Sequence, residues 1–259
     1  MSDAPLIDLT GKTILVTGAS RGIGAAAAKA LGAAGATVIA HYGSYREGAE
    51  EAVAALPEGR KLLVQANLEQ AGAARALWRH VVADYARIDV VVVNAGISVE
   101  TPFEGTDEQW DEGWERTLRI NLLESASLIR EAVAHFSANG GGAVISLSSW
   151  AAQQGSAIAS LSAYAASKAA LKAVTQTVAR NYAKDGVLAY VVAPGIVGTR
   201  MSEISAVSRG GIDKLNAVLT LGEMVPAQEL GTLIAFLASG TCRHLTGATI
   251  DVSGATYVR

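Results

Sequence analysis

Short runs of β-branched and apolar residues alternate along this chain with alanine-rich stretches of helical length. Alternating strands and helices are typical of a parallel sheet with helices on both of its faces. Residues 90–93 are valine at every position, as expected for a strand that is covered on both faces. The alternation therefore predicts a doubly wound α/β fold. Strands are expected at residues 13–17, 37–40, 61–65, 89–93, 143–147, 187–192 and 249–252.

The length and composition of the chain favour one large domain. The chain has 259 residues, of which 50% are hydrophobic and 17% are charged, so it can bury a sizeable core. We find no low-complexity segment or interdomain linker, and we expect residues 1–259 to form one domain with its core at about 9–254. Two helix boundaries are also indicated. Thr106 and Gln109 have the spacing of a capping box, and Gly186 stands where a long helix is expected to end.

Charge and residue counts exclude several classes of function. The formal net charge is -3 and no run of Lys and Arg forms a basic stripe, so nucleic acid is not expected as a partner. The first ten residues are polar, and no apolar run approaches the roughly 20 residues that span a bilayer, so we expect a soluble cytoplasmic protein. The single cysteine, Cys242, excludes an intrachain disulfide, and the four scattered histidines predict no metal site.

The first expected strand runs directly into a glycine-rich turn, Thr17-Gly-Ala-Ser-Arg-Gly-Ile-Gly24. Its three glycines permit a tight turn and a close approach of the backbone to a ligand. A helix that begins near Gly22 would aim its free N–H groups and the positive end of its dipole at a pyrophosphate. The turn therefore predicts a dinucleotide-binding Rossmann fold. The cofactor-binding residues predicted in this turn are Gly18, Ser20, Arg21, Gly22, Ile23 and Gly24.

Tyr164 and Lys168 stand four residues apart, in Tyr-Ala-Ala-Ser-Lys, at the start of a segment that is expected to be helical. At this spacing the two side chains lie on one face of a helix. A free phenol has a pKa of about 10, so a nearby ammonium that favours the phenolate would make the tyrosine a useful proton exchanger near pH 7. Tyrosine and lysine also meet at this spacing on many solvated helix faces, so the pair alone does not identify an acid–base device.

Taken in order, the motifs of this chain resemble those of the short-chain dehydrogenase/reductase family, in its compact single-domain branch. The resemblance covers roughly residues 9–254. It rests on the glycine turn, Val93-Asn-Ala-Gly96, Asn121, Ser148-Ser149, Tyr164-x-x-x-Lys168, and Pro194-Gly195 followed by Thr199. The family implies a seven-stranded parallel sheet flanked by helices, an NAD(P)-dependent oxidoreductase, and a homotetramer or homodimer. Within the family, the chain is similar to 3-oxoacyl-acyl-carrier-protein reductases.

The resemblance implies a proton-transfer site. Tyr164 would give a proton to the alkoxide that forms when a ketone is reduced, or accept one when an alcohol is oxidised. Lys168 would hold the ribose hydroxyls of the cofactor and lower the pKa of Tyr164. Ser149 would hydrogen-bond the substrate oxygen, with Ser148 as the alternative. Asn121 would distort its helix and bind a water that relays protons; the alternative is a buried asparagine that satisfies backbone groups.

Other positions are implied to hold the cofactor. Asn67 stands where the family usually has an aspartate whose side chain contacts the adenine, and asparagine can still pair with that base. The Val197 backbone and the Thr199 hydroxyl would meet the nicotinamide carboxamide. The cofactor-binding residues implied outside the glycine turn and the second strand are Asn67, Leu68, Asn94, Ala95, Gly96, Tyr164, Lys168, Pro194, Gly195, Val197 and Thr199.

The end of the second expected strand favours NADP over NAD. Enzymes that use NAD normally place an acidic residue there, which pairs with the ribose hydroxyls and repels a 2′-phosphate. This chain has Tyr42 near that position and no carboxylate. Arg21 stands where a basic residue of the family commonly contacts the phosphate, and Ser44 and Arg46 could add contacts. We therefore predict NADP as the cofactor, with NAD as the alternative, and we count Tyr42 and Ser44 among the cofactor-binding residues.

The sequence says least about the substrate. We predict an oxidoreductase (EC 1.1.1.-) that transfers a hydride between NADP(H) and a small-molecule ketone or secondary alcohol. A segment at about residues 200–225 would cover the substrate pocket, although its apolar residues equally fit plain helix packing. Two alternatives stay open: a 3-oxoacyl-acyl-carrier-protein reductase and a cofactor-binding sensor without catalysis. Residues 131–144 contain no Lys or Arg to receive an acidic carrier protein, and the intact proton-transfer set weighs against a sensor.

Overall fold

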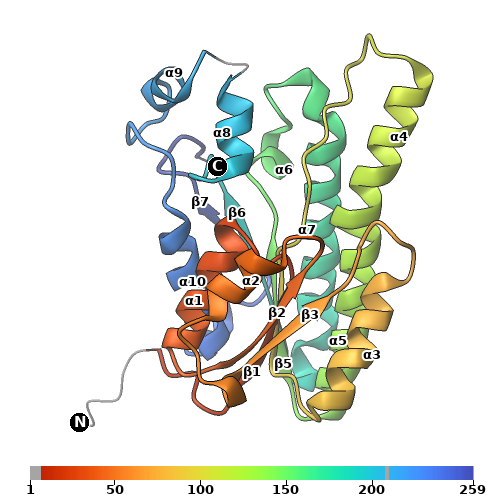
Figure 1. Ribbon diagram of the computed structural model, residues 1–259, viewed down its shortest axis with the longest axis vertical. Coiled ribbons are helices and arrows are strands. Elements are labelled where there is room, and N and C mark those ends of the chain that lie inside the picture. The colour runs from red at the N-terminus through yellow and green to blue at the C-terminus, as the bar shows by residue number, and fades with distance from the viewer. Residues whose placement is uncertain (1–6, 208–209, 259) are drawn as a thin grey trace.

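The computed structural model describes residues 7–207 and 210–258. Within these residues the strands form one parallel sheet of seven strands, in the order β3-β2-β1-β4-β5-β6-β7 (Figure 1). The predicted doubly wound Rossmann fold in a single domain is thereby confirmed. The strands are β1 (Thr13–Val16), β2 (Thr37–Tyr42), β3 (Lys61–Gln65), β4 (Val90–Val93), β5 (Gly142–Leu147), β6 (Val187–Pro194) and β7 (Thr249–Val252).

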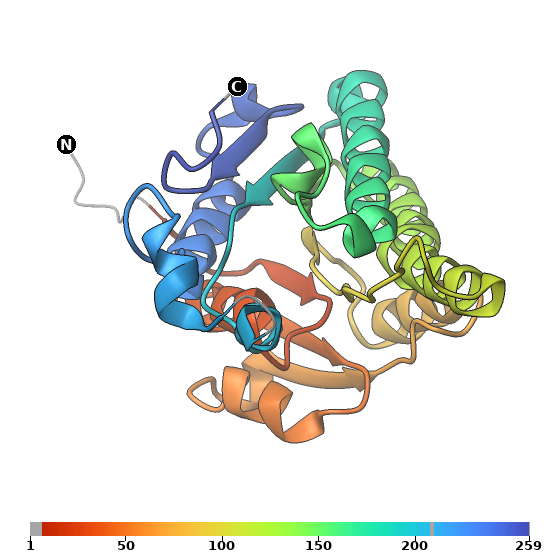
Figure 2. The same ribbon diagram turned by 90° about the horizontal axis from the view of Figure 1, so that it is seen from above.

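Helices cover both faces of the sheet, as the view from above shows (Figure 2). Helices α1, α2 and α10 pack on one face, and α3, α5 and α7 pack on the other. Helices α6, α8 and α9 lie beyond the carboxyl ends of the strands, and α4 lies beside α7. The helices are α1 (Gly22–Ala33), α2 (Arg46–Val53), α3 (Ala73–Asp84), α4 (Asp107–Leu118), α5 (Ser125–Ala138), α6 (Ala151–Gln154), α7 (Ser162–Tyr182), α8 (Arg200–Val207), α9 (Ile212–Ala217) and α10 (Ala227–Ser239).

The central strand β4 shows why every one of its positions is apolar. Val90 and Val92 belong to the core under α1 and α10, whereas Val91 and Val93 belong to the core under α3, α5 and α7. Because successive side chains of a strand point to opposite faces, a strand that is covered on both sides needs an apolar residue at each position. The sequence run at 90–93 is therefore explained by two separate cores.

Most strand boundaries agree with the expected ranges to within a residue. The exceptions are β2 and β6, which extend two residues further than predicted. Both extensions are paired in register, Tyr42 with Gln65 and Pro194 with Val252. The neighbouring strand therefore supplied the hydrogen bonds that prolong them, which local sequence does not reveal.

The two predicted helix boundaries are present. The Thr106 hydroxyl accepts from the Gln109 N–H (3.3 Å), and the Gln109 side chain accepts from the Thr106 N–H (3.2 Å), which completes the capping box. Such a cap is worth about 1 kcal/mol to the helix. Helix α7 ends at Tyr182, and Gly186 follows with φ +78, a left-handed conformation that suits glycine.

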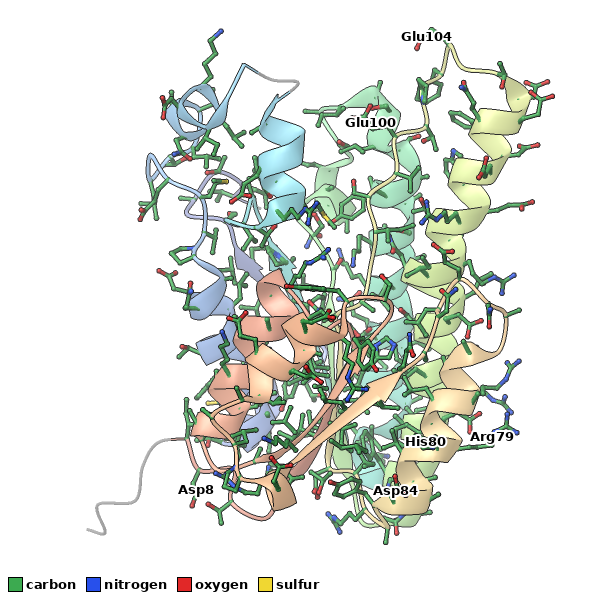
Figure 3. The ribbon with its side chains drawn as sticks, in the orientation of Figure 1. Asp8, Arg79, His80, Asp84, Glu100 and Glu104 are labelled. Atoms are coloured by element: carbon green, nitrogen blue, oxygen red, sulfur yellow. The ribbon has the colours of Figure 1, made fainter. Side chains whose placement is uncertain are left out.

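Parallel strands bring their carboxyl ends to one edge of the sheet. Figure 3 labels two residues at this end of the molecule, Glu100, which follows β4, and Glu104. It labels Asp8 and Asp84 at the opposite end. The chain runs from β1 outward to β3 and then returns to β4 on the other side of β1. This reversal leaves a crevice at the carboxyl ends of β1 and β4, where α/β proteins bind ligands. Among the described helices, none is both long and apolar enough to cross a membrane.

The packing of α1 against α10 gives a stability test. A Cβ added to Gly231 of α10 would lie 2.6 Å from the carbonyl oxygen of Ala26 in α1. Helix propensity alone favours alanine over glycine by about 1 kcal/mol. We expect Gly231→Ala to lower the free energy of unfolding instead, by about 1–3 kcal/mol, because the two backbones must separate. Urea unfolding measures the difference.

The matched control for this test is Gly43→Ala. Gly43 lies in a loop without a positive φ, and a Cβ there would meet no atom within 4 Å. We expect its free energy of unfolding to change by no more than about 0.5 kcal/mol. A Gly231→Ala protein as stable as the wild type would contradict the close helix contact.

Candidate functional site

The crevice is held by hydrogen bonds between Thr17, at the end of β1, and Asn94, at the end of β4. The Thr17 hydroxyl donates to the Val92 carbonyl (3.2 Å) and accepts from the N–H groups of Asn94 (3.0 Å) and Ala95 (3.1 Å). The Asn94 side-chain amide donates to the carbonyls of Thr17 (2.8 Å) and Gly18 (3.1 Å). These bonds fix the glycine turn against β4 at the point where the two strand ends diverge.

The glycine turn has the conformation that its sequence predicts. Gly18 and Gly22 have φ of +66 and +53, which L side chains rarely adopt. A Cβ on Gly24 would overlap the Gly18 carbonyl, so the third glycine lets α1 pack directly beneath the turn. Helix α1 begins at Gly22, and its N-cap residue, Arg21, makes no side-chain capping hydrogen bond. The first N–H groups of α1 therefore lack a side-chain partner and suit an anion.

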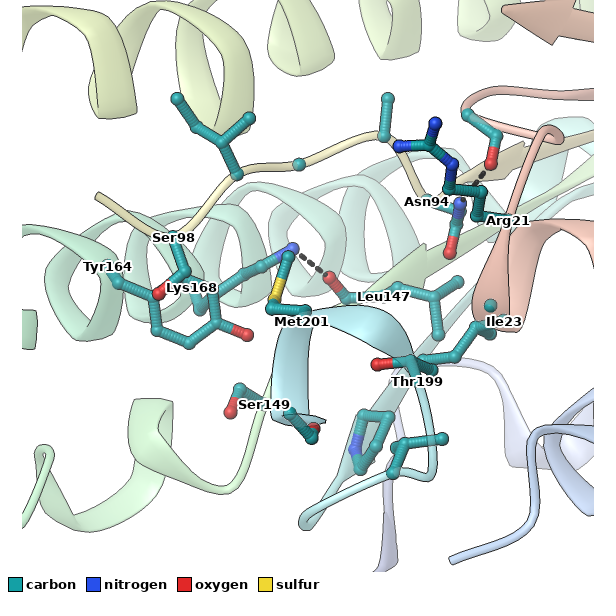
Figure 4. A pocket seen from close by; sticks show the side chains of 18 of the residues that line it. Arg21, Ile23, Asn94, Ser98, Leu147, Ser149, Tyr164, Lys168, Thr199 and Met201 are labelled. Atoms are coloured by element: carbon teal, nitrogen blue, oxygen red, sulfur yellow. Dashed lines mark hydrogen bonds between the residues drawn. The ribbon is translucent and has the colours of Figure 1, made fainter. Parts of the chain in front are cut away.

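A cavity of about 670 Å³ lies over this turn and extends along the carboxyl edge (Figure 4). Four basic residues line it: Arg21, Arg116, Lys168 and Arg200. No Asp or Glu of the described residues lines this cavity. The Arg116 guanidinium also pairs with the Glu69 carboxylate (2.6 Å), and both of these side chains are exposed. The cavity is therefore suited to an anionic ligand.

Most of the predicted site residues meet in this cavity. Those that line it are Gly18, Arg21, Gly22, Ile23, Asn94, Ala95, Gly96, Ser149, Tyr164, Lys168, Pro194, Gly195, Val197 and Thr199. Those outside its walls are Ser20, Gly24, Tyr42, Ser44, Asn67, Leu68 and Asn121.

The residues predicted at the second and third strands have other partners in the structure. The Tyr42 ring is buried, and its hydroxyl accepts from Arg46 (3.3 Å). The Asn67 side-chain oxygen accepts from the N–H of Glu69 (3.0 Å). Contact of either residue with a cofactor stays a prediction.

Tyr164 and Lys168 lie together on α7, beside the first cavity (Figure 4). The Lys168 Nζ donates to the Leu147 carbonyl (2.8 Å) and lies 5.9 Å from the centre of the Tyr164 ring. Burial lowers the pKa of Lys168 to about 8, and it raises the pKa of the Tyr164 phenol, against the opposing effect of a side-chain hydrogen bond from Ser149. The expected lowering of the Tyr164 pKa by Lys168 is therefore not seen, because burial is the largest influence on the phenol and it raises the pKa.

Three polar contacts hold α7 on β5. The Ser148 hydroxyl donates to the Lys168 carbonyl (2.9 Å), the Lys168 ammonium donates to the Leu147 carbonyl, and the Thr175 hydroxyl donates to Ser146 (2.8 Å). Ser148 is therefore a positioning residue for the helix. Ser149, the next residue, hydrogen-bonds the Tyr164 side chain. The geometry favours Ser149 over Ser148 for contact with a ligand.

Asn121 stands in a π-helical segment, Arg119–Glu124, which is the helix distortion that the sequence suggested. Its side chain accepts from the Ile97 N–H (2.8 Å) and donates to the Ile97 carbonyl (2.9 Å) and to Ser167 (3.0 Å). Ser167 donates in turn to the Tyr164 carbonyl (2.7 Å). The Asn121 amide thus joins the end of β4 to the start of α7, and the water relay stays a prediction.

Two further buried groups near the site were missed by the sequence reasoning. The Glu124 carboxylate, in the same π-helical segment, accepts from the N–H groups of Gly72 (2.9 Å) and Ala74 (2.9 Å) at the start of α3. It therefore ties the Asn121 segment to the chain that follows β3. These contacts join residues about 50 positions apart in the chain, so a local sequence motif cannot predict them.

His41 is the second missed group, and it supports the glycine turn. The Gly18 N–H donates to His41 Nδ1 (3.1 Å), so the ring hydrogen must sit on Nε2, which lies 3.0 Å from the Ala66 carbonyl. The ring is 2% exposed, and burial lowers its pKa. A proton added at Nδ1 would oppose the Gly18 N–H and leave that donor without a partner, at a cost of about 1–3 kcal/mol.

A second cavity, of about 620 Å³, opens beside the first. The two share Ser149 and Tyr164 as part of their walls, together with Ser98, Gly195, Met201 and Ser202. Tyr164 therefore stands where a ligand in one cavity would meet a ligand in the other.

The His41 contact predicts a pH dependence of stability. Because its folded pKa lies below the unfolded value of about 6.5, the unfolded chain binds more protons as the pH falls. Its contribution to stability is complete above pH 6.5 and is lost as the pH falls below that value. We expect His41→Asn, which keeps an acceptor for Gly18 without titrating, to show a smaller loss of Tm between pH 8 and pH 5 than the wild type.

The control is His80→Asn, at an exposed histidine labelled in Figure 3, which should lose Tm with the wild-type profile. The dependence that remains in His41→Asn includes His135, whose pKa is also lowered, by burial and by Arg87. A profile of His41→Asn that matches the wild type would show that the Gly18 contact does not depend on a neutral ring.

Comparison with known proteins gives consistent results. The family model described as short chain dehydrogenase matches residues 12–207. A 3beta-hydroxysteroid dehydrogenase 1 of Eggerthella lenta is 33% identical, over 95% of this chain and 94% of its own. A 3-oxoacyl-[acyl-carrier-protein] reductase of Staphylococcus aureus is 31% identical, over 95% and 98%. A crystal structure of 3-oxoacyl (acyl-carrier-protein) reductase from Agrobacterium tumefaciens C58 with NADP bound matches with a TM-score of 0.84 and 32% identity, covering 95% of each chain.

Proposed function

Because this chain belongs to the short chain dehydrogenase family of NAD(P)-dependent oxidoreductases, we propose that it interconverts a ketone and a secondary alcohol with NADP(H), through Tyr164. The observation that carries the proposal is the position of Tyr164 on the wall that the two cavities share. A proton donor at that junction can reach a substrate in the second cavity while a cofactor fills the first.

The first cavity fits a dinucleotide phosphate. Its glycine turn leaves no room for a Cβ: one on Gly18 would lie 3.0 Å from Ala95, and one on Gly22 would lie 2.9 Å from Thr199. The start of α1 offers N–H groups without a side-chain cap, and four basic residues line the walls. Arg21 is exposed, with its guanidinium 4.1 Å from the centre of the Tyr45 ring, a position from which it could bind a phosphate. The Agrobacterium relative was solved with NADP, which supports the same cofactor here.

The chemistry is divided between the cofactor and the chain. A bound NADP(H) would supply or accept the hydride. The Tyr164 phenol, whose pKa burial raises above its usual value of about 10, is protonated near pH 7, so it would donate its proton to the developing alkoxide in the direction of reduction. Ser149, which hydrogen-bonds Tyr164, would hold the substrate oxygen beside the phenol. Lys168, with a pKa of about 8, would be mainly charged at pH 7 and would hold ribose hydroxyls.

We also propose that the segment at about 200–225 covers the substrate. It contains α8 and α9, and an isolated pairing of Val197 with Val225 closes its base. Met201 of α8 and Leu215 of α9 line the second cavity. The alternative activity, reduction of a carrier-bound 3-oxoacyl group, is supported by the relatives from Staphylococcus and Agrobacterium.

Replacement of the phenol tests the proton donor. We expect Tyr164→Phe to lower kcat at least ~100-fold, since a general acid is removed from the transition state. NADPH affinity, measured by fluorescence titration, should be retained. The control is Tyr182→Phe, at a partly exposed tyrosine at the other end of α7, which should keep wild-type turnover. Full turnover by Tyr164→Phe would refute the role of Tyr164.

Replacement of Arg21 tests the choice of cofactor. The wild type should have a higher kcat/KM for NADPH than for NADH. Arg21→Ala should lower the NADPH value about tenfold and leave the NADH value nearly unchanged, because a charge-assisted hydrogen bond is lost. Arg79→Ala, at an exposed residue of α3 labelled in Figure 3, is the control and should change neither. A wild-type preference for NADH would overturn the assignment.

A further inference from the structure

The two cavities that meet at Tyr164 differ in charge. The first has four basic residues and no acid among the described residues of its walls. The second has the opposite character: Glu100 is its single Asp or Glu, and no Lys, Arg or His of the described chain lines it. An anionic ligand is therefore favoured on one side of Tyr164 and disfavoured on the other.

The remaining wall of the second cavity is largely apolar. Its larger apolar side chains are Trp150, Ile158, Leu161, Ile196, Met201 and Leu215. Its volume of about 620 Å³ lies well within the range of pockets that enclose drug-sized ligands. Such a wall stabilises a bulky carbon skeleton by removing apolar surface from water.

Glu100 stands at the exposed rim of this wall. It belongs to the segment that follows β4, and its side chain is exposed (Figure 3). Among the described residues it has no ion-pair partner within 4 Å. A carboxylate is only an acceptor of hydrogen bonds when ionised, so it favours a hydroxyl or amine on the ligand and repels a second anion.

We propose that the second cavity selects a bulky, largely apolar ketone or secondary alcohol without an anionic group, and that Glu100 is the residue that enforces this choice. The inference rests on the proposed function and adds the substrate class. Discrimination of this kind uses a repulsive element against the wrong ligand as well as an attractive surface for the right one. Glu100 favours a hydrogen-bond donor on the part of the substrate that reaches the rim.

The same argument bears on thioester substrates. A thioester of coenzyme A or of a carrier protein brings phosphate groups along with the acyl chain. The walls of the second cavity, as far as the structure describes them, offer no cation to pair with a phosphate, and Glu100 would repel it. Such thioesters are therefore expected to be poor substrates.

A matched series of ketones tests the substrate class. We would compare 4-oxocyclohexanecarboxylate, its methyl ester, 4-(hydroxymethyl)cyclohexanone and acetoacetyl-coenzyme A, following NADPH consumption. We expect kcat/KM for the ester to exceed that for the carboxylate by about tenfold or more, the size of a like-charge interaction near a protein surface. The hydroxymethyl ketone should equal or exceed the ester. A preference for the carboxylate or for the thioester would overturn the inference.

Variants of Glu100 assign the effect to one residue. Glu100→Gln should reduce the ester-to-carboxylate ratio, and Glu100→Lys should bring it to unity or reverse it, with the change in KM rather than in kcat. Glu104→Lys makes the same change of charge on the same loop, at an exposed residue that lines neither cavity (Figure 3). Its ratio should stay close to that of the wild type. A Glu100→Lys ratio equal to that of Glu104→Lys would show that net charge, and not Glu100, sets the preference.

Binding can be measured without turnover, because Trp150 lines the second cavity. Each ketone would be titrated into the NADP⁺-loaded protein while tryptophan fluorescence is recorded, with Trp150→Phe to identify the signal. If neutral ketones bind more tightly than the carboxylate but NADPH is not consumed, the proposed reaction fails and the selection by Glu100 stands. If the carboxylate binds as tightly as its ester, the selection by Glu100 fails, whatever the turnover.

Discussion

The hydrogen bonds between Thr17 and Asn94 are the constraint on which the site depends. The sheet reverses its winding between β1 and β4, so the carboxyl ends of these strands diverge and leave backbone groups without ladder partners. One threonine hydroxyl and one asparagine amide satisfy these groups and fix the glycine turn. His41 supports the same turn from β2. The fixed turn sets the point at which α1 begins. It thereby places the uncapped N–H groups of α1 beneath the cavity.

The burial of Lys168, next to Tyr164 in the proton-transfer site, lowers the stability of the fold. Lys168 is buried, and desolvation lowers its pKa to about 8. Between pH 8 and its unfolded pKa of 10.5, the unfolded chain holds a proton that the folded chain does not. Its charge is therefore unfavourable to folding at neutral pH. The polar contacts that hold α7 on β5 keep Lys168 and Tyr164 in place despite this cost. An unfavourable buried charge of this kind is expected at a functional site, where a residue is selected for its chemistry rather than for the stability of the fold.

Local features of the chain were predictable from the sequence, and long-range contacts were not. The valine run of β4, the glycine turn and the capping box at Thr106 each depend on neighbours within a few residues, and all appear in the structure. The effect of burial on Tyr164 depends on elements that pack around it, so helix spacing suggested a lowered pKa where the structure has a raised one. Glu124 was missed for the same reason, because its partners lie at the start of α3, about 50 residues away in the chain. Contact of Tyr42 with a cofactor stays a prediction, but the burial of its ring beside β3 was not evident from the local sequence.

Some residues line both cavities and others line only one. This difference determines which substitutions can change the substrate preference without affecting the cofactor site. Met201 lines both cavities, and Thr199, just before α8, approaches Gly22 of the phosphate-binding turn. A substitution at the start of α8 therefore disturbs both sides of Tyr164 together. Glu100 lines the second cavity only and stands at its exposed rim. Charge at this position can change without altering a wall of the first cavity, so substrate preference can diverge there while the cofactor cradle stays the same.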